Sequence, residues 1–214
     1  MILLTAAKIP EGLDKSTLAL LVGALFPASE NQEYVNAIES RADEGAATES
    51  LFALSLVYEQ IKSLPFIDTD TQSLVLARNE NGKPYFINSK IKFNISHSKG
   101  YVTCATAFDE EGGVDIEAAD LMVERAEKLA KRFFNEADAT AIKKSSKSFQ
   151  KLWSEKEAKA KFLGKSIGNV LSQDKSNTNP EKFCDIIAHN FSYDEIPITL
   201  CTKRDYSTII FTAQ

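Results

Sequence analysis

The sequence predicts an α+β protein made of two similar halves, each a small, mostly antiparallel sheet packed on helices. Two observations lead to this fold class. In both parts of the chain, stretches with apolar residues at helical spacing are followed by short segments typical of strands. In addition, residues 93–103 align without gaps on residues 198–208, and both segments have the pattern of a strand, a turn and a strand that opens with tyrosine. We interpret this echo as a diverged duplication that divides the chain into residues 1–111 and 112–214.

The first half opens with helical stretches and ends in a predicted hairpin. In its longest helical stretch, Leu51, Leu54 and Ile61 fall at helical spacing, and Asn81-Gly82 is a turn signal ahead of a strand-like segment. We expect helices at 18–26 and 46–62, strands at 83–86, 91–96 and 101–108, and a tight turn at 97–100.

The second half begins near Gly112-Gly113 with a strand-like segment. Gly164 follows the last periodic residue of its longest helical stretch and marks the end of that helix. We expect strands at 113–117, 183–188, 196–202 and 206–212, helices at 122–134 and 149–163, a helix restart at 135–138, and a polar surface loop at 172–182.

Length and composition are those of a soluble globular protein. The 214 residues are 43% hydrophobic and 26% charged, enough for one large domain or two small ones. The first residues lack the basic start of a signal peptide, and the longest apolar run, 18–26, is too short to span a bilayer. Three cysteines without CxxC spacing indicate free thiols in a reducing compartment. We therefore expect a cytoplasmic protein that does not contact a membrane.

The charge distribution says more than the total charge. A net charge of −5 argues against general nucleic-acid binding. Residues 121–165 hold 12 Lys and Arg against 6 Asp and Glu, a local balance of +6 that leaves −11 for the rest of the chain. Composition alone favours a solvated helix face as the explanation. The alternative is a docking surface for an acidic partner or an anionic cofactor.

Three carboxylates from two distant segments are candidates for one metal site. In a strand, alternation puts Asp115 and Glu117 on the same face. In a helix, Glu157 and Lys161 lie one turn apart, on the face that also carries Trp153. Carboxylates beside a lysine suit a hard divalent cation and a pyrophosphate. The alternative for Glu157 and Lys161, an i,i+4 helix pair worth about 0.3–0.5 kcal/mol, would be preferred without the strand carboxylates.

Four motifs follow one another along the chain. They read GKP at 82–84, FNISHS at 93–98, GVDIE at 113–117 and WSEKEAKAKFLGKS at 153–166. Together they resemble the 4′-phosphopantetheinyl transferases, specifically the larger, pseudodimeric type. The resemblance implies transfer of the 4′-phosphopantetheine arm of coenzyme A to a serine of an apo acyl or peptidyl carrier protein, with release of adenosine 3′,5′-bisphosphate. It also implies two α+β halves with coenzyme A between them, so we expect a monomer.

Carried over by position, the resemblance also implies residue roles. The implied magnesium ligands are Asp115, Glu117 and Glu157, Lys161 is placed on the pyrophosphate, and the implied coenzyme A contacts are Lys83, Pro84, Ser96 and His97. His97 would lie near the adenosine 3′-phosphate. Glu157 is the best candidate for the base that deprotonates the carrier serine, directly or through a water molecule.

Some of these residues have structural alternatives. Lys83 is as well explained as an exposed turn lysine. His97, in a hairpin turn, can simply hydrogen-bond to backbone, although its place between two serines favours the coenzyme A role. Trp153 is better explained as core packing that fixes its helix. The sequence does not distinguish Mg²⁺ from Mn²⁺ or identify the carrier.

One segment departs from the family pattern. The N-terminal half of the family usually carries a basic cluster that leads into a helix, but here residues 39–51 are mostly acidic and Arg41 is the only cation among them. This departure leaves an alternative open, a non-catalytic module of the same fold that binds carrier proteins or nucleotides. A third interpretation, another magnesium-dependent phosphotransferase, finds no P-loop or GxGxxG pattern in the chain.

Overall fold

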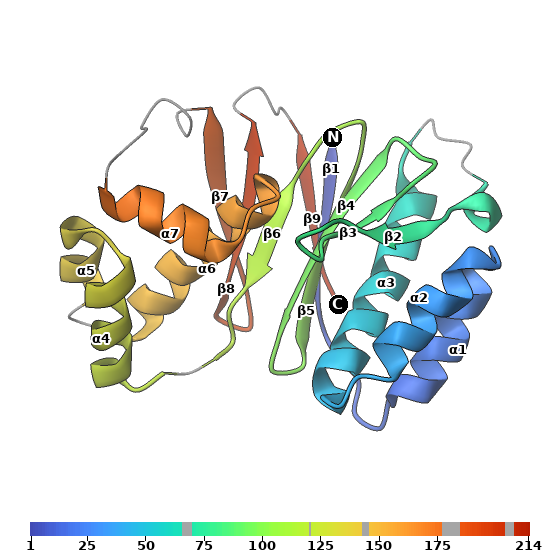
Figure 1. The fold of residues 1–214 in the computed structure, drawn as a ribbon, viewed down its shortest axis with the longest axis horizontal. Coiled ribbons are helices and arrows are strands. Elements are labelled where there is room, and N and C mark those ends of the chain that lie inside the picture. Colours follow the sequence, from blue (N-terminus) through green and yellow to red (C-terminus); the bar gives the residue numbers. More distant parts are fainter. Residues whose placement is uncertain (66–69, 120, 143–145, 177–184, 204–207) are drawn as a thin grey trace.

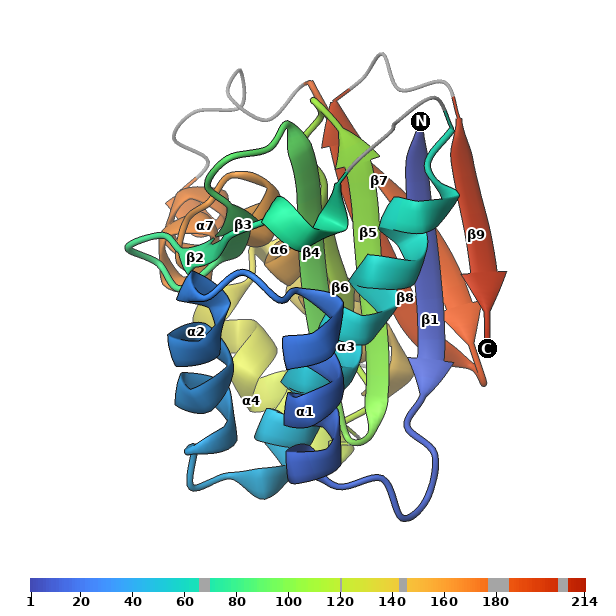
Figure 2. The same ribbon diagram turned by 90° about the vertical axis from the view of Figure 1, so that its right-hand side faces the viewer.

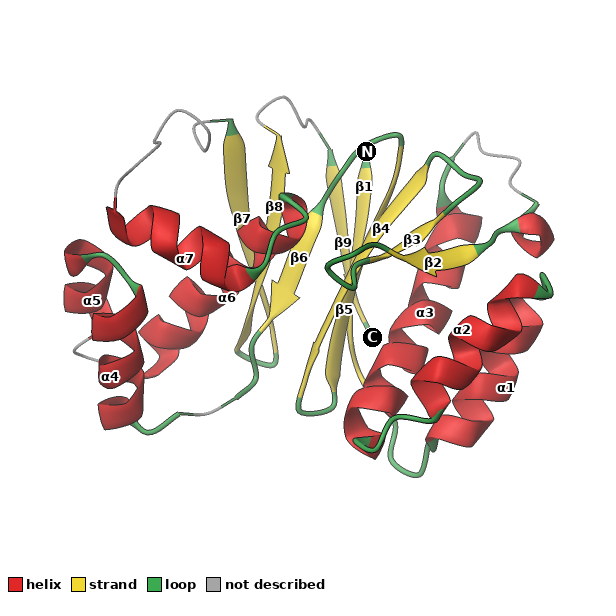
Figure 3. Cartoon of the chain, viewed as in Figure 1, coloured by secondary structure: helices red, strands yellow, loops and turns green. Residues whose placement is uncertain are grey.

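The computed structural model describes residues 1–65, 70–119, 121–142, 146–176, 185–203 and 208–214. In these residues, helices gather on two outer sides and the strands lie between them (Figures 1 and 3). The predicted α+β class is confirmed. No helix within the described part of the chain is both long and apolar enough to cross a membrane.

The first half of the chain supplies one helical layer and most of one sheet. Its helices are α1 (Lys15–Leu25), α2 (Glu30–Glu39) and α3 (Glu44–Ser63), with a 3₁₀ turn at Thr71–Ser73, and its strands are β1 (Ile2–Lys8), β2 (Leu76–Arg78), β3 (Pro84–Phe86), β4 (Ile91–Ser98) and β5 (Tyr101–Phe108). Aspartates cap two of the helices, since Asp14 accepts from the backbone N–H groups of Ser16 and Thr17, and Asp43 accepts from that of Ala46.

The second half supplies the other helical layer and a second sheet. Its helices are α4 (Val123–Phe133), α5 (Glu136–Ile142), α6 (Ser146–Phe162) and α7 (Ile167–Ser176), and its strands are β6 (Gly113–Ile116), β7 (Ile186–Tyr193), β8 (Ile196–Lys203) and β9 (Ile209–Ala213). Gly164 follows α6 with a positive φ of 62°, which is the expected conformation for a glycine just past a helix end.

The strands form two larger sheets and one small ribbon. One sheet has the order β4-β5-β1-β9, the second has the order β6-β8-β7, and β2 pairs with β3. Pairing within the two larger sheets is antiparallel except for β9, which runs parallel to β1. Figure 2 shows α3 in front of the first sheet, next to α1 and α2. The last strand of the second half is therefore part of the sheet built mainly by the first half.

The two larger sheets share one apolar core. Its buried members come from both halves, namely Ile2, Leu4, Ala6, Ala105 and Ala107 from the first sheet and Val114, Ile116, Ile198 and Leu200 from the second. The other face of the first sheet packs on α3, which in turn packs on α1. Strand β1 is thus buried on both faces, which explains why its sequence is apolar except for Thr5 and the terminal Lys8, without the alternation that would have predicted a strand.

A third apolar cluster holds the helices of the second half together. It is centred on three aromatic side chains, with the rings of Phe134 and Phe149 stacked at 5.7 Å and those of Phe149 and Trp153 stacked at 5.5 Å between centroids. Trp153 is half-buried and packs against this cluster, which agrees with its expected role in fixing α6.

Three sequence predictions need correction. The four-residue turn at 97–100 is in fact the two residues Lys99 and Gly100, with φ of 49° and 80°, so His97 lies in β4. Helix α7 occupies residues 167–176, where a polar loop was expected from 172 onward; the rest of that loop, 177–182, lies outside the described residues. Helix α2 and strand β1 were not predicted.

The gapless alignment of residues 93–103 with 198–208 does not match two equivalent hairpins. Residues 93–103 belong to the β4–β5 hairpin, but 198–208 begins in β8 and runs toward β9, and these strands lie in different sheets. The hairpin that matches β4–β5 in pairing is β7–β8. In each case the second strand of the hairpin also pairs antiparallel with the first strand of its half, β1 or β6.

Candidate functional site

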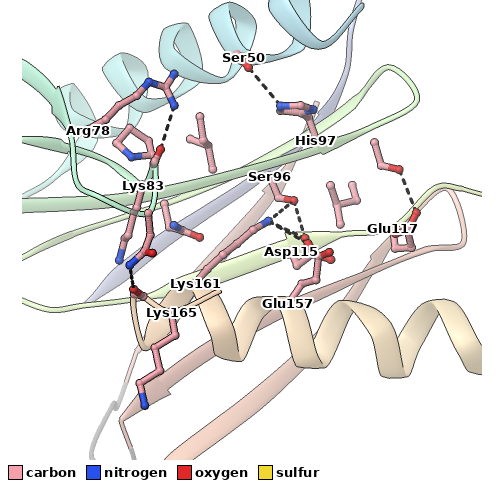
Figure 4. Close-up of a pocket in the computed structure, with 18 of the residues that line it drawn as sticks. Ser50, Arg78, Lys83, Ser96, His97, Asp115, Glu117, Glu157, Lys161 and Lys165 are labelled. Carbon is pink, nitrogen blue, oxygen red and sulfur yellow. Dashed lines mark hydrogen bonds and ion pairs between the residues drawn. The ribbon is translucent and has the colours of Figure 1, made fainter. Parts of the chain in front are cut away.

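A cleft of about 470 Å³ opens where β4 and β6, which belong to different sheets, come together. Its other walls are the β2–β3 turn, the C-terminal part of α6, and the region around Arg41 and Ser50 (Figure 4). Every predicted site residue lines this cleft: Lys83, Pro84, Ser96, His97, Asp115, Glu117, Glu157 and Lys161.

Three alternate polar residues of β4 connect it to the segment that begins with β6. Asn94 Oδ1 accepts from the Val114 backbone N–H at 2.7 Å, Ser96 Oγ donates to Asp115 Oδ1 at 2.7 Å, and Ser98 Oγ donates to Glu117 Oε1 at 3.2 Å. Because side chains at alternate positions share one face of a strand, these three residues can all face the second sheet. They fix where both strand carboxylates lie.

Helix α6 approaches β6 unusually closely. A Cβ atom at Gly113 would lie 2.2 Å from the Ala158 carbonyl oxygen and 2.3 Å from the Phe162 nitrogen, so only glycine fits there. Ser154 Oγ donates to the Asp115 carbonyl oxygen at 3.2 Å. This close packing brings the cleft-facing side chains of α6 to the carboxylates of β6.

The buried side chains of Asp115 and Ser96 form a triangle with the half-buried Lys161 at the centre of the cleft. The Lys161 ammonium lies 2.7 Å from both Ser96 Oγ and Asp115 Oδ1. The Asp115 side chain is only 3% exposed, and its second oxygen, Oδ2, is buried with no hydrogen-bond partner among the described residues. A buried carboxylate oxygen without a partner is costly unless a cation or donor completes it.

Glu157 faces the same triangle from α6. Its Oε1 accepts from the indole N–H of Trp153 at 3.0 Å, and its Oε2 lies 3.8 Å from the Lys161 ammonium. Burial and the nearby charge of Asp115 raise the pKa of Glu157 to about 7. The Glu157 carboxyl is therefore able to exchange a proton near neutral pH.

Glu117 lies farther along the same face. Its Oε1 accepts from Ser98 Oγ and, at 2.8 Å, from the Ala119 backbone N–H. Burial raises the pKa of Glu117, and the charge of Asp115 adds to the increase. Two carboxyls in one cleft thus have raised pKa values, as expected for buried groups close to another carboxylate.

The carboxylates suit a hard cation, although they do not form a closed cage. Within the described residues, no group of three or more Asp, Glu, His or Cys side chains is arranged to hold a metal ion by itself. The unpartnered oxygen of Asp115 and the raised pKa values of Glu117 and Glu157 nevertheless indicate an excess of negative charge. Oxygen donors with this excess fit Mg²⁺, which usually completes its shell with water and phosphate oxygens.

At the other end of the cleft, His97 lies between α3 residues. Its Nδ1 is 2.6 Å from Glu49 Oε2 and its Nε2 is 3.2 Å from Ser50 Oγ. Arg41 donates to the same Ser50 oxygen at 3.1 Å. No local pattern predicts these contacts, because His97 is almost fifty positions away from Glu49 along the chain.

Lys83 and Pro84 line the cleft where the β2–β3 turn covers it. The Lys83 ammonium lies 2.9 Å from Glu111 Oε2, and its side chain is 17% exposed. It is therefore a largely buried, ion-paired lysine, which weakens the alternative of an exposed turn residue.

Several cleft residues were missed by sequence reasoning. Arg78 comes from β2, donates to the Gly82 carbonyl oxygen and stacks over the Tyr34 ring, and Lys165 follows the end of α6. Asn81 donates to the Gly164 carbonyl oxygen at 2.8 Å and so ties the β2–β3 turn to the end of α6. Asn81 and Lys165 stand next to or within the recognised motifs, whereas nothing local singles out Arg78.

Comparison with known proteins supports the motif analysis. Residues 112–196 match the model of a family described as the 4′-phosphopantetheinyl transferase superfamily. A 4′-phosphopantetheinyl transferase, gsp, of Aneurinibacillus migulanus is 28% identical over 172 residues, which cover 78% of this chain and 68% of the relative. A Synechocystis sp. protein provisionally named as a 4′-phosphopantetheinyl transferase is 30% identical over 138 residues, which cover 60% of this chain and 52% of the relative. The matched family range contains Asp115, Glu117, Glu157 and Lys161.

Proposed function

We propose that this chain is a member of the 4′-phosphopantetheinyl transferase superfamily and transfers the 4′-phosphopantetheine arm of coenzyme A to a serine of an apo acyl or peptidyl carrier protein. The observation that carries the proposal is the triangle of Lys161, Ser96 and Asp115, with Glu157 beside it. Carboxylates and a lysine at the meeting of two sheets are the groups that a diphosphate substrate requires.

In the proposed reaction, the carrier serine oxygen attacks the phosphorus next to pantetheine. A bond forms between that oxygen and phosphorus, and the bond from phosphorus to the bridging oxygen breaks, so adenosine 3′,5′-bisphosphate leaves. Glu157 accepts the serine proton through a water molecule, because ligation of the same carboxylate to a metal ion lowers its basicity. Lys161 places its ammonium on a diphosphate oxygen, where negative charge grows during transfer.

Asp115, Glu117 and Glu157 would hold a Mg²⁺ ion in this cleft. The ion, when bound, neutralises charge on the diphosphate and orients its leaving group. The orphaned oxygen of Asp115 is the best support for this ligand set, because it is a buried acceptor that needs a cation. Ser96 and Ser98 keep Asp115 and Glu117 directed toward the cleft by donating to them.

Coenzyme A would occupy the remainder of the cleft. Lys83 and Pro84 come from the turn that covers it, and Ser96 and His97 come from its floor. The family match supports coenzyme A as the substrate for this space, and the basic side chains Arg41, Arg78 and Lys165 add positive charge to its walls.

Three finer features belong to the same proposal. The matching strand pairing of β1, β4 and β5 with β6, β7 and β8 supports a pseudodimer of two related halves. Since one chain would then supply the whole site, we propose that the protein acts as a monomer, which sedimentation can test. The basic face of residues 121–165 suits an acidic carrier protein as the partner.

Transfer of a fluorescent coenzyme A arm tests the proposal. The protein is incubated with the labelled coenzyme A, Mg²⁺ and several apo carrier proteins, and a known transferase labels the same set as a control. We expect labelling of at least one carrier, and loss of labelling without Mg²⁺. Absence of labelling on every carrier would contradict the proposal, and carrier binding without coenzyme A binding would favour the non-catalytic module.

A pair of variants on α6 tests the site itself. Glu157→Gln should lower the rate of transfer by at least about a hundredfold, since it removes the proton acceptor and a cation ligand. Glu155→Gln, two residues away on the same helix, should retain most activity because Glu155 is not in the cleft. Equal activity of the two variants would remove Glu157 from the mechanism.

A further inference from the structure

Four side chains form a connected group at the α3 end of the cleft. Glu49 accepts from the Gly100 backbone N–H at 2.5 Å through Oε1 and contacts His97 Nδ1 at 2.6 Å through Oε2. On the other side of the ring, His97 Nε2 lies 3.2 Å from Ser50 Oγ, and Arg41 donates to that same oxygen at 3.1 Å (Figure 4). The imidazole is therefore held from both of its nitrogens.

The hydrogen bonds of Ser50 determine what His97 Nε2 carries. A serine hydroxyl has one hydrogen to donate and two lone pairs to accept with. Ser50 Oγ donates its hydrogen to the Ala46 carbonyl oxygen at 2.8 Å. It accepts from Arg41, so its remaining lone pair faces His97 Nε2. Nε2 must therefore be a donor and carry a hydrogen.

The contacts of Glu49 determine what His97 Nδ1 carries. The Glu49 side chain is 12% exposed, and although burial alone would raise its pKa, the hydrogen bonds from His97 and from the Gly100 N–H bring the pKa of Glu49 below its usual value. The carboxyl is thus ionised at neutral pH and can only accept. Nδ1 must carry a hydrogen as well, and an imidazole with hydrogen on both nitrogens is a cation.

We propose that Glu49 is a positioning residue that holds His97 as an imidazolium, which with Arg41 forms a two-cation site for a phosphate monoester. This inference rests on the proposed function, in which that monoester is the 3′-phosphate of coenzyme A. Glu49 belongs to the acidic segment that departs from the family pattern. One of its carboxylates would therefore supply positive charge to the cleft indirectly, by stabilising a neighbouring cation.

The charged groups around His97 have opposite effects on its imidazolium form: some favour it and others disfavour it. Glu49 favours the imidazolium, and Asp43, which raises the pKa of Glu49, adds negative charge on the same side. Arg41 faces the ring through Ser50 and disfavours a second cation, as does Arg78 across the cleft. Burial and Arg78 lower the pKa of Arg41, a sign that positive charge is concentrated at this end of the cleft. Such concentration suits a ligand with two negative charges.

Nitrogen-15 NMR of the histidine side chains tests the charge state in the wild-type protein. The chain has two histidines, so both are resolved and His189 serves as an internal reference. Burial lowers the pKa of His189, whose Nε2 contacts Thr202 Oγ1 at 3.0 Å, so it should be neutral at pH 7. We expect hydrogen on both nitrogens of His97 at pH 7. A single neutral tautomer of His97 at that pH overturns the proposal.

Kinetics with two substrates test the role of the group. In Glu49→Gln, KM for coenzyme A should rise roughly tenfold, the lower end of what a charge-assisted hydrogen bond contributes, with kcat within about twofold of wild type. KM for 3′-dephospho-coenzyme A should not change. Glu44→Gln is the matched control, because Glu44 starts α3, is 80% exposed and lies outside the cleft. An equal rise in KM for both substrates would contradict a site for the 3′-phosphate.

The outcomes separate this inference from the proposed function. If the wild-type protein labels no carrier, the transferase proposal fails, while the NMR result still decides the charge state of His97. If transfer occurs but Glu49→Gln behaves like Glu44→Gln, the transferase stands and the positioning role fails. Thermal melting of each variant checks that a change in KM does not come from partial unfolding.

Discussion

At the scale of single residues, Lys161 stands where a divalent cation would be needed. Its ammonium contacts the one partnered oxygen of Asp115, and the other oxygen has no partner among the described residues. In the substrate-free protein the lysine thus acts as an internal counter-ion for a buried carboxylate. A diphosphate that draws the ammonium toward itself would release Asp115 for the metal, so substrate and metal should bind cooperatively.

Substitution of this lysine should strengthen metal binding in the absence of coenzyme A. In Lys161→Met, the affinity for Mn²⁺ measured by calorimetry should rise by about tenfold or more. A neighbouring cation lowers the proton affinity of a carboxylate by at least about tenfold, and its removal should strengthen the binding of a metal cation to a similar extent. Lys165→Met is the control, since Lys165 lines the cleft without contacting Asp115. Weaker binding to Lys161→Met than to wild type would show that Lys161 does not compete with the metal.

The raised pKa of Glu157 makes stability depend on pH. The value of about 7 in the folded protein exceeds the ordinary value of 4.5, so the native state retains this proton longer than the unfolded chain. Stability from this group is fully present below about pH 4.5 and is lost as pH rises through 7. In metal-free protein, Glu157→Gln should therefore be more stable than wild type at pH 8 by about 1 kcal/mol, or about 2–4 °C in Tm.

The comparison between two pH values gives that experiment its control. At pH 5, where Glu157 is largely protonated in the native protein, wild type and Glu157→Gln should melt at nearly the same temperature. A stability difference of the same size at both pH values would mean that the carboxyl does not titrate as expected.

At the scale of elements, the contact between β6 and α6 determines whether the site exists. Gly113→Ala would place a methyl group against the α6 backbone, so the helix must move away from the carboxylates. We expect a loss of about 3 kcal/mol, a Tm lower by about 6–12 °C, and loss of coenzyme A binding. Calorimetric melting and binding measurements on the same sample check both effects.

Gly168→Ala is the matched control for that substitution. Gly168 lies in α7, and a Cβ atom there would meet nothing within 4 Å. Alanine should be neutral or stabilise the protein by up to about 1 kcal/mol, since it restricts the unfolded chain in a helical position. A Gly113→Ala variant as stable as Gly168→Ala would disprove the close packing of α6 on β6.

Local rules predicted elements and faces, but not which elements meet. Strand alternation gave the shared face of Asp115 and Glu117, and helical spacing gave Glu157 with Lys161, because both depend on neighbours in sequence. The bond from Ser96 to Asp115 and that from Glu49 to His97 depend on how whole sheets and helices pack, so no local pattern announces them. Strand β1 was missed for a related reason, since burial on both faces removes its alternation.

At the scale of the whole molecule, the two halves are joined through a shared core. Strand β9 comes from the second half and pairs with β1, and apolar residues of both larger sheets are buried against each other. Neither half can bury these faces alone. We therefore propose that the boundary predicted at residue 111 separates two parts of one cooperative unit.

Unfolding of the whole protein should accordingly be a single transition. Trp153 is the only tryptophan and reports on α6, whereas far-ultraviolet circular dichroism reports on the helices of both halves. We expect the two signals to change at the same urea concentration. A fragment of residues 1–111 should not fold, because it would expose the apolar face of β1 and β5. Two separate transitions, or a folded fragment, would show that the halves are independent.

The polar connection between β4 and the second sheet limits how the length of this chain can vary. Asn94, Ser96 and Ser98 each reach across from one face of one strand. Inserting or deleting a single residue between Asn94 and Ser98 would turn part of this row to the opposite side of the sheet, so the contacts could no longer all form. Relatives that keep these three hydrogen bonds should therefore tolerate added or lost residues in the loops at either end of β4, but not within the strand.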